Sequence, residues 1–485
     1  MTKNLTLTLN LLAGLLVSTT TLTAFDQPAN WHANGTGRYP DTNPPTQWCA
    51  VPGSASKNVI WNRPLPSWSN SSPLIMGDRV FVCGEPTSLI CLNLTDGAIL
   101  WQREHELIDT LTANEKAELA KVREQDGPIL KSIDELIKQR GILEKEVVSA
   151  DRRKEVDEKI KNVRAEIANI EKQNEALLKV SRNYTKRLTP GWYMGGSGLS
   201  TPSPVGDGKY VYVLYGNGVS AAYDLDGNRM WMRFVEHTNG RYGQMASPIV
   251  VENRVVVHLN KLTALNSTNG KTVWQTETPD MTNLGNGSPV LMRIGDICAV
   301  ITLRGHVVSV RDGRKIDFGM PPGKSCWNTP VVEKDTVYFN WLLPSWAGRL
   351  SLSPNGEIAT NVFWKEDFCK GGEPFVASPV FHDGLLYCMQ YCGDIFVVDA
   401  KTGQLVYRHV MRLSADGHMI NPSLVAAGGY IYAGDLGGNI VVIKTGREFS
   451  EVARNRTDPF RSTPVFHNNR LYLRTLKGVL CIGEK

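Results

Sequence analysis

The sequence predicts an all-β fold, an eight-bladed β-propeller of four-stranded antiparallel blades with an inserted α-helical coiled-coil hairpin. Three observations carry this prediction: a Ser-Pro, Thr-Pro or Asn-Pro dipeptide recurs eight times, short β-type runs follow each copy, and only one interval between copies is irregular. Several short strands in each unit of about 40 residues are typical of propellers, in which every unit is one blade.

Composition is consistent with such a fold. The chain has 485 residues, of which 42% are hydrophobic, and it contains 12 Trp and 44 Gly. This apolar content supports a packed core and argues against a disordered chain. The formal net charge is +5, and no basic run indicates a nucleic-acid partner.

Residues 1–24 resemble a signal peptide, and residues 25–57 then form an N-terminal extension. Lys3 supplies a positive charge, a mostly apolar stretch follows, and Leu22-Thr23-Ala24 offers a cleavage site. A buried N-terminal helix is the alternative. No other stretch has the roughly 18 apolar residues that span a bilayer. We therefore expect a periplasmic or secreted protein with no transmembrane segment in the mature chain.

The repeat itself starts at the Ser/Thr-Pro position. Its copies are Ser72-Pro73, Ser203-Pro204, Ser247-Pro248, Ser288-Pro289, Thr329-Pro330, Ser378-Pro379, Asn421-Pro422 and Thr463-Pro464. Successive prolines are 41 to 49 residues apart, except for one interval of 131 residues after the first copy. An insertion therefore interrupts the first unit.

Each copy continues in the same internal order. Three β-type runs lead to a turn dipeptide, and a fourth run follows it. The turns are Asp96-Gly97, Asp226-Gly227, Asn269-Gly270, Asp312-Gly313, Asn355-Gly356, Thr402-Gly403 and Thr445-Gly446. Gly permits the positive φ that a tight hairpin needs. Trp101, Trp231 and Trp274 lie four residues after the Gly, and Tyr407 takes this place in a fourth copy.

The last copy ends at Lys485 without a fourth strand, which would leave an open edge in the ring. Ahead of the first Ser-Pro, residues 58–61 (Asn-Val-Ile-Trp) match the fourth-strand pattern of residues 98–101 (Ala-Ile-Leu-Trp). We therefore expect the strand around Trp61 to complete the last blade beside Leu480. The propeller then comprises residues 58–103 and 188–485.

Nine cysteines form no Cys-x-x-Cys pair and no zinc-binding pattern. Cys388 and Cys392, four residues apart at an expected hairpin, are the best local candidates for a disulfide. Two other cysteines align with a small-residue position on the third strand and are expected to pack between blades. They are Cys91 and Cys481, which align with Ala222, Ala264, Ser309 and Ser351. The first cysteine is Cys49, so we expect no lipid anchor of the lipoprotein type.

The insertion, residues 104–187, has no Trp and equal numbers of acidic and basic side chains. Apolar residues recur in it at spacings of three, four and seven, which predicts a helical hairpin with coiled-coil packing that turns near Ser149 to Asp151. Both a solvated spacer and a docking arm for a partner protein fit this composition.

Residues 262–274, Leu-Thr-Ala-Leu-Asn-Ser-Thr-Asn-Gly-Lys-Thr-Val-Trp, closely resemble the repeat of the pyrroloquinoline quinone (PQQ)-binding-like propeller family. The resemblance covers roughly residues 58–103 and 191–485. It implies one of two functional classes. Quinoprotein dehydrogenases hold PQQ and Ca²⁺ in the channel and typically cap the cofactor with a disulfide between adjacent cysteines. BamB-like members are non-catalytic scaffolds. No Cys-Cys dipeptide occurs here.

We expect the second class: an exported, non-catalytic scaffold or binding protein with a role in protein–protein interaction or envelope assembly. A PQQ-dependent alcohol or sugar oxidoreductase is the alternative, with PQQ and calcium as its cofactors. Segments just before each proline should surround one mouth of the channel and offer sites for protein or peptide partners. The candidates are Asn70, Ser200, Gln244, Asn286, Trp327, Asn328, His418 and Arg461.

This predicted ring contains amides but no acid, whereas a Ca²⁺ site needs several converging oxygen ligands. We therefore expect no catalytic residue, no metal site and no bound cofactor. Carboxylates from loops, such as Asp224, Glu373 and Asp399, would change this expectation if they converged on the channel. The histidines show no Ser-His-Asp or His-Glu-x-x-His spacing.

Overall fold

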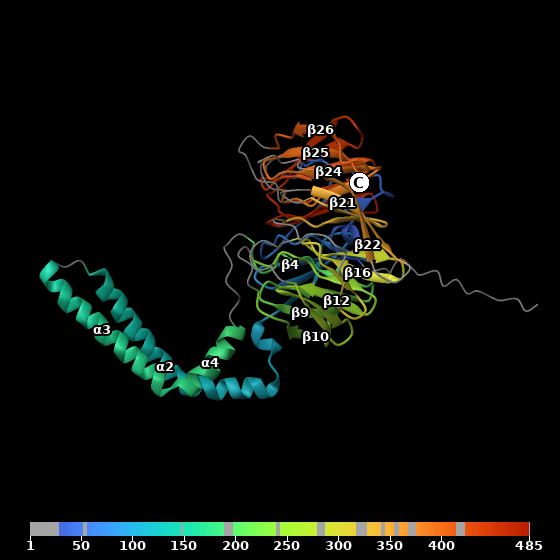
Figure 1. Cartoon of the computed structure of the whole chain (residues 1–485). Coiled ribbons are helices and arrows are strands. Elements are labelled where there is room, and N and C mark those ends of the chain that lie inside the picture. The colour runs from blue at the N-terminus through green and yellow to red at the C-terminus, as the bar shows by residue number, and fades with distance from the viewer. Residues whose placement is uncertain are drawn as a thin grey trace, which may run out of the picture.

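The computed structural model describes residues 29–51, 56–146, 149–188, 197–238, 243–278, 287–316, 327–340, 345–353, 358–366, 375–413 and 422–484. Their strands gather into one body made of eight sheets, each with four antiparallel strands, and a helical arm leaves that body on one side (Figure 1). This arrangement confirms the predicted eight-bladed propeller. The expected signal peptide lies outside the described residues.

Blades 1 to 4 are each formed by four strands that are consecutive in the chain. Blade 1 contains β3 (Leu74–Met76), β4 (Arg79–Gly84), β5 (Ser88–Asn93) and β6 (Ile99–Glu104). Blade 2 contains β7 (Val205–Gly206), β8 (Tyr210–Leu214), β9 (Val219–Asp224) and β10 (Arg229–Phe234). Blade 3 contains β11 (Ile249–Val251), β12 (Arg254–His258), β13 (Lys261–Asn266) and β14 (Thr272–Glu277). Blade 4 contains β15 (Val290–Ile294), β16 (Ile297–Ile301), β17 (Val307–Ser309) and β18 (Lys315–Ile316).

The remaining blades continue the ring, and two of them recruit strands from the N-terminal region. Blade 5 contains β19 (Val331–Glu333), β20 (Thr336–Phe339), β21 (Ser345–Leu352) and β22 (Ile358–Glu366). Blade 6 contains β23 (Val380–His382), β24 (Leu385–Met389), β25 (Asp394–Asp399) and β26 (Leu405–Val410). Blade 7 contains β27 (Val425–Ala427), β28 (Tyr430–Gly434), β29 (Asn439–Lys444) and β30 (Glu451–Arg456), with β1 (Arg38–Tyr39) added beside β27. Blade 8 contains β31 (Val465–His467), β32 (Arg470–Arg474), β33 (Gly478–Ile482) and β2 (Val59–Pro64).

The N-terminal strand β2 closes the ring, as predicted. It pairs antiparallel with β33, and Trp61 lies opposite Cys481 while Asn62 lies opposite Leu480. Pairing of an N-terminal strand with the C-terminal strand covers the edge that a three-stranded last blade would expose.

The repeated Trp and Gly residues hold neighbouring blades together. Trp231 on the outer strand of blade 2 donates from Nε1 to the carbonyl oxygen of Ser267 in blade 3, at 2.7 Å. A Cβ atom on Gly270 would lie 2.7 Å from the Trp231 ring, and Gly270 has φ +69°. The hairpin therefore needs Gly at this position, because the backbone has a positive φ and because a Cβ atom would clash with the indole ring. The same docking occurs for Trp61 on Gly97, Trp101 on Gly227, Trp274 on Gly313 and Trp364 on Gly403.

Cys91 and Cys481 are fully buried and face these tryptophans, because Cys91 pairs with Trp101 and Cys481 with Trp61. Burial raises the pKa of Cys91 to about 12, so it is an inert packing thiol as expected. The alignment of Ser351 with this position was wrong: in blade 5, Ala347 faces Trp364. The pairing of Cys388 with Cys392 was also wrong, because Cys392 is an exposed free thiol.

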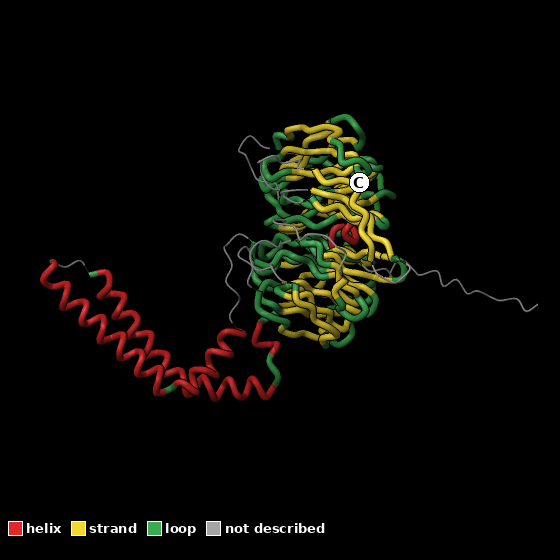
Figure 2. The backbone as a smooth tube through the Cα atoms, in the orientation of Figure 1, coloured by secondary structure: helices red, strands yellow, loops and turns green. Residues whose placement is uncertain are grey.

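The insertion forms three helices that project from the propeller (Figure 2). They are α2 (Ala113–Lys145), α3 (Ala150–Gln173) and α4 (Glu175–Leu188), preceded by the 3-10 turn η1 (Leu107–Thr110). The predicted helical hairpin is therefore present, with a third helix that the sequence pattern did not separate. No helix among the described residues is long and apolar enough to cross a membrane.

Candidate functional site

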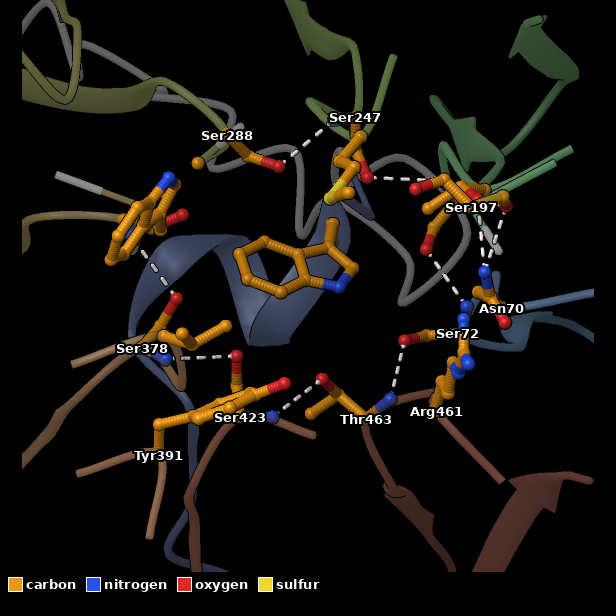
Figure 3. A pocket seen from close by; sticks show the side chains of 18 residues that line it. Asn70, Ser72, Ser197, Ser247, Ser288, Ser378, Tyr391, Ser423, Arg461 and Thr463 are labelled. Carbon is orange, nitrogen blue, oxygen red and sulfur yellow. Dashed lines mark hydrogen bonds between the residues drawn. The ribbon is translucent and has the colours of Figure 1, made fainter. Parts of the chain in front are cut away.

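A belt of hydroxyl groups surrounds the channel axis, with one residue from each blade. In Figure 3 the labelled hydroxyls lie in a ring around the pocket. Between neighbouring blades, the backbone N–H of one belt residue donates to the hydroxyl oxygen of the next belt residue. This hydrogen bond is present at seven of the eight contacts between neighbouring blades. These bonds measure 2.8 to 3.3 Å and run from Ser72 to Ser203, Ser203 to Ser247, Ser247 to Ser288, Thr329 to Ser378, Ser378 to Ser423, Ser423 to Thr463 and Thr463 to Ser72.

This belt explains why the chain repeats Ser or Thr two residues before the innermost strand. It also corrects the seventh copy, which was placed at Asn421-Pro422. In the structure the belt residue of blade 7 is Ser423, which lies two residues before β27, as Ser378 does before β23. The following residue is Leu424 instead of Pro, so the proline pattern missed it.

At the eighth contact, between Ser288 of blade 4 and Thr329 of blade 5, the Thr329 hydroxyl accepts no such hydrogen bond. The Thr329 hydroxyl is buried, lines the channel cavity and has no hydrogen-bond partner among the described residues. A buried hydroxyl without a partner costs about 1–3 kcal/mol. A bound molecule that forms a hydrogen bond with the Thr329 hydroxyl would remove this cost.

The N-terminal segment, residues 29–39, closes one end of the channel. Ala29 pairs with Gly206 of blade 2, and the Asn30 amide bonds both backbone groups of Val250 in blade 3. His32 donates from Nε2 to the Leu424 carbonyl in blade 7, at 2.7 Å. The short helical turn α1 (Trp31–Gly35) lies between these anchors, and its dark blue ribbon crosses behind the belt in Figure 3.

The hydroxyl belt and this segment enclose a cavity of about 400 Å³. Trp31 lines it from the N-terminal segment, and Trp327 and Tyr391 line it from blades 5 and 6. Arg461 is the only charged side chain among the described residues of the lining. The site therefore combines aromatic surfaces, many hydroxyls and one cation.

The candidate residues from the sequence separate into three groups. Asn70, Trp327 and Arg461 line the cavity. Ser200, Gln244 and Asn328 are buried and bond the protein instead: Gln244 donates to the His258 carbonyl at 2.7 Å, and Asn328 donates to the Asn340 carbonyl at 2.8 Å. Asn286 and His418 lie outside the described residues.

Sequence reasoning missed Trp31, Tyr391 and Ser423. Trp31 belongs to a non-repeated segment, so no period marks it. Tyr391 follows the second strand of blade 6 and is brought to the channel by the turn before β25. A search of each hairpin between second and third strands would have found Tyr391, whereas no sequence signal identifies Trp31.

The described lining of the cavity offers no acidic ligand for the calcium ion of a PQQ site. Among the described lining residues there is no carboxylate, and no cluster of three or more His, Cys, Asp or Glu side chains occurs in the described part of the chain. Asp224 and Asp399, which we considered as loop carboxylates, occupy outer parts of blades 2 and 6 at hairpin turns. Glu373 lies outside the described residues.

Comparisons with known proteins found a matching family model and similar solved structures. A family model described as "Outer membrane protein assembly factor BamB" matches residues 51–137, 191–341 and 359–484. The solved structure of BamB from Moraxella catarrhalis is similar, with a TM-score of 0.52 and 13% identity over 87% of this chain and 96% of that chain. A quinohemoprotein alcohol dehydrogenase from Pseudomonas putida HK5 has a TM-score of 0.46 and 10% identity over 87% of this chain and 72% of that one. A comparison with curated proteins gave no match.

Proposed function

The chain belongs to the family described as outer membrane protein assembly factor BamB, and on that premise we propose that it is an exported, non-catalytic binding protein of the cell envelope. The observation that carries this proposal is the channel. Its described lining has no carboxylate or histidine that would act as a general base, and its own N-terminal segment closes one end. Such a cavity suits binding better than turnover.

The helical arm supplies a second surface for a protein partner. Its helices bury Ile133, Val156, Ile160 and Val163 against one another, which supports the coiled-coil packing proposed for α2 and α3. On α2, the Leu130 and Ile137 side chains are 43% and 42% exposed. They lie seven residues apart and so share one face of the helix.

A paired experiment tests the binding role. The double variant Leu130→Ser/Ile137→Ser removes the exposed apolar pair of α2, and Lys131→Ser/Lys138→Ser is the matched control on a charged face of the same helix. We expect chemical crosslinking in the intact cell envelope to join the wild type and the control to the same protein partner. The apolar variant should lose that crosslink.

The oxidoreductase alternative has its own test on the purified protein. Titration with PQQ and Ca²⁺ should give no dye reduction with alcohols or sugars. Dye reduction that is abolished by removal of Ca²⁺ would overturn the non-catalytic proposal.

A further inference from the structure

Trp31 is held in place by a strained backbone. His32, Ala33 and Asn34 have φ values of 57°, 48° and 58°, so α1 is a left-handed turn built from non-glycine residues. A left-handed conformation costs roughly 1–2 kcal/mol for each such residue. Strain of this kind persists only where the surrounding structure enforces it, and it is commonest at functional sites.

The anchors on both sides of Trp31 enforce this turn. The Asn30 side chain holds Val250, and Arg38 forms an ion pair of 2.5 Å with Glu333 of blade 5. The centroid of the buried His32 ring lies 4.8 Å from that of the Trp31 ring, so the two rings pack together. Burial lowers the pKa of His32 to about 4, so the imidazole is neutral at pH 7 and donates to Leu424. The indole is therefore presented to the cavity by a rigid support.

The hydroxyl belt leaves the cavity rich in hydrogen-bond donors. Seven belt hydroxyls accept a backbone N–H, and none of the eight donates to an acceptor among the described residues. A hydroxyl that accepts one bond still has its own proton to donate. Together with the Arg461 guanidinium, these groups favour a ligand that carries acceptors and negative charge.

We propose that the axial cavity binds a small ring-bearing organic anion, whose ring stacks on Trp31 and whose carboxylate is paired by Arg461 and by belt hydroxyls. The cavity volume of about 400 Å³ falls in the range of small-molecule sites. Trp327 and Tyr391 supply further aromatic surface around the ring. This inference names a ligand class for the proposed binding protein, and it makes the N-terminal segment part of the site.

Isothermal titration calorimetry with three naphthalene probes tests the proposal on the full exported protein. The probes are 1-naphthoate, the neutral 1-naphthalenemethanol and the cationic 1-naphthylmethylammonium, which share a ring and differ in charge. We expect 1-naphthoate to bind at one site, at least tenfold more tightly than the neutral probe, and the cationic probe to bind most weakly.

Variants at two residues locate the bound probe. Trp31→Ala should weaken 1-naphthoate binding about tenfold or more, while Trp31→Phe should weaken it only about threefold because an aromatic ring remains. Arg461→Gln should abolish the preference for the anion and leave the neutral probe unchanged. Trp68→Ala and Arg456→Gln alter exposed residues outside the lining and serve as matched controls.

Equal affinity for the three probes, or anion binding that Trp31→Ala leaves unchanged in a folded protein, would overturn the proposal. The crosslinks of the α2 surface are an independent readout. If they persist while 1-naphthoate fails to bind, the ligand class is wrong and the partner-binding role stands.

Discussion

Thr463 and Thr329 occupy the same position of the repeat, but only Thr463 accepts a belt hydrogen bond, from the Ser423 N–H at 3.3 Å. Thr329 Oγ1 has no partner among the described residues. Replacing each threonine by isosteric valine therefore separates the belt bond from packing. We expect Thr463→Val to lower the free energy of unfolding by about 1–2 kcal/mol and Thr329→Val to leave it unchanged or slightly higher. Thermal unfolding followed by calorimetry measures both, and equal losses would show that the belt bond contributes nothing.

The Trp–Gly docking gives a second prediction at the scale of single residues. Gly270→Ala should destabilise the protein by about 2–4 kcal/mol, because it adds a left-handed alanine and a clash with the Trp231 ring. Gly384 has a similar φ of +76°, but no described atom lies within 4 Å of the place that a Cβ atom would take. Gly384→Ala should therefore cost only the backbone part, about 1 kcal/mol. The difference between the melting temperatures of the two variants measures the contribution of the contact between Gly270 and the Trp231 indole. Equal melting temperatures would show that this contact does not stabilise the protein.

Strand β2 behaves differently from other outer strands, because it joins a blade whose remaining strands lie at the opposite end of the chain. Trp61 and Trp274 are 9% and 8% exposed and dock on Gly97 and Gly313 in the same way. We expect Trp61→Ala and Trp274→Ala each to cost about 3–5 kcal/mol. Only Trp61→Ala should release a strand, seen as new protease cleavage around residues 56–66 by mass spectrometry. Identical cleavage patterns would mean that closure does not depend on this docking.

The helical arm should be removable at the correct boundary. His105 is fully buried with its ring 4.7 Å from that of Tyr215, and Leu107 and Leu111 are also buried, so the residues before Thr112 pack on the propeller. Deletion of residues 112–188 should leave the melting temperature within about 2 °C of the wild type. Deletion of residues 104–187 removes His105 and should lower it clearly. An insoluble product from the first deletion would contradict this boundary.

At the scale of the whole molecule, three buried histidines make stability depend on pH. Burial lowers the pKa of His32 and His105 to about 4 and that of His258 to about 3, from an ordinary value of 6.5. Below pH 6.5 these histidines bind protons in the unfolded chain but stay neutral in the folded protein. The free energy of unfolding therefore falls as the pH falls towards 4. Each histidine contributes up to about 3 kcal/mol to this loss.

Melting temperatures measured from pH 7.5 to pH 4 check this dependence. His105→Asn keeps a donor towards the Thr87 carbonyl, which His105 bonds through Nδ1 at 2.8 Å, but it has no proton to take up. The variant should show a flatter decline between pH 6.5 and pH 4 than the wild type. A melting temperature that stays constant down to pH 5 would contradict the prediction.

The sequence by itself determined the number of blades, the closing strand and the helical insertion. The blades and the closing strand repeat one sequence pattern, and the insertion interrupts the regular spacing of that pattern. Strand pairing in a propeller is local, so a 41- to 49-residue spacing of prolines already implies the stacking of blades. The matching patterns at Trp61 and Trp101 likewise sufficed to place β2. Asn70, Trp327 and Arg461 could be placed near the channel for the same reason.

Only the tertiary structure decided what the channel contains. The segment from Ala29 to Tyr39 has no repeat, and its course depends on contacts with blades 2, 3, 5 and 7, whose residues lie hundreds of positions away. Gln244 and Asn328 occupy positions like those of the cavity residues, yet their amides turn to buried carbonyls. A side chain's direction is set by the partners that burial leaves available, and these partners exist only once the ring has closed.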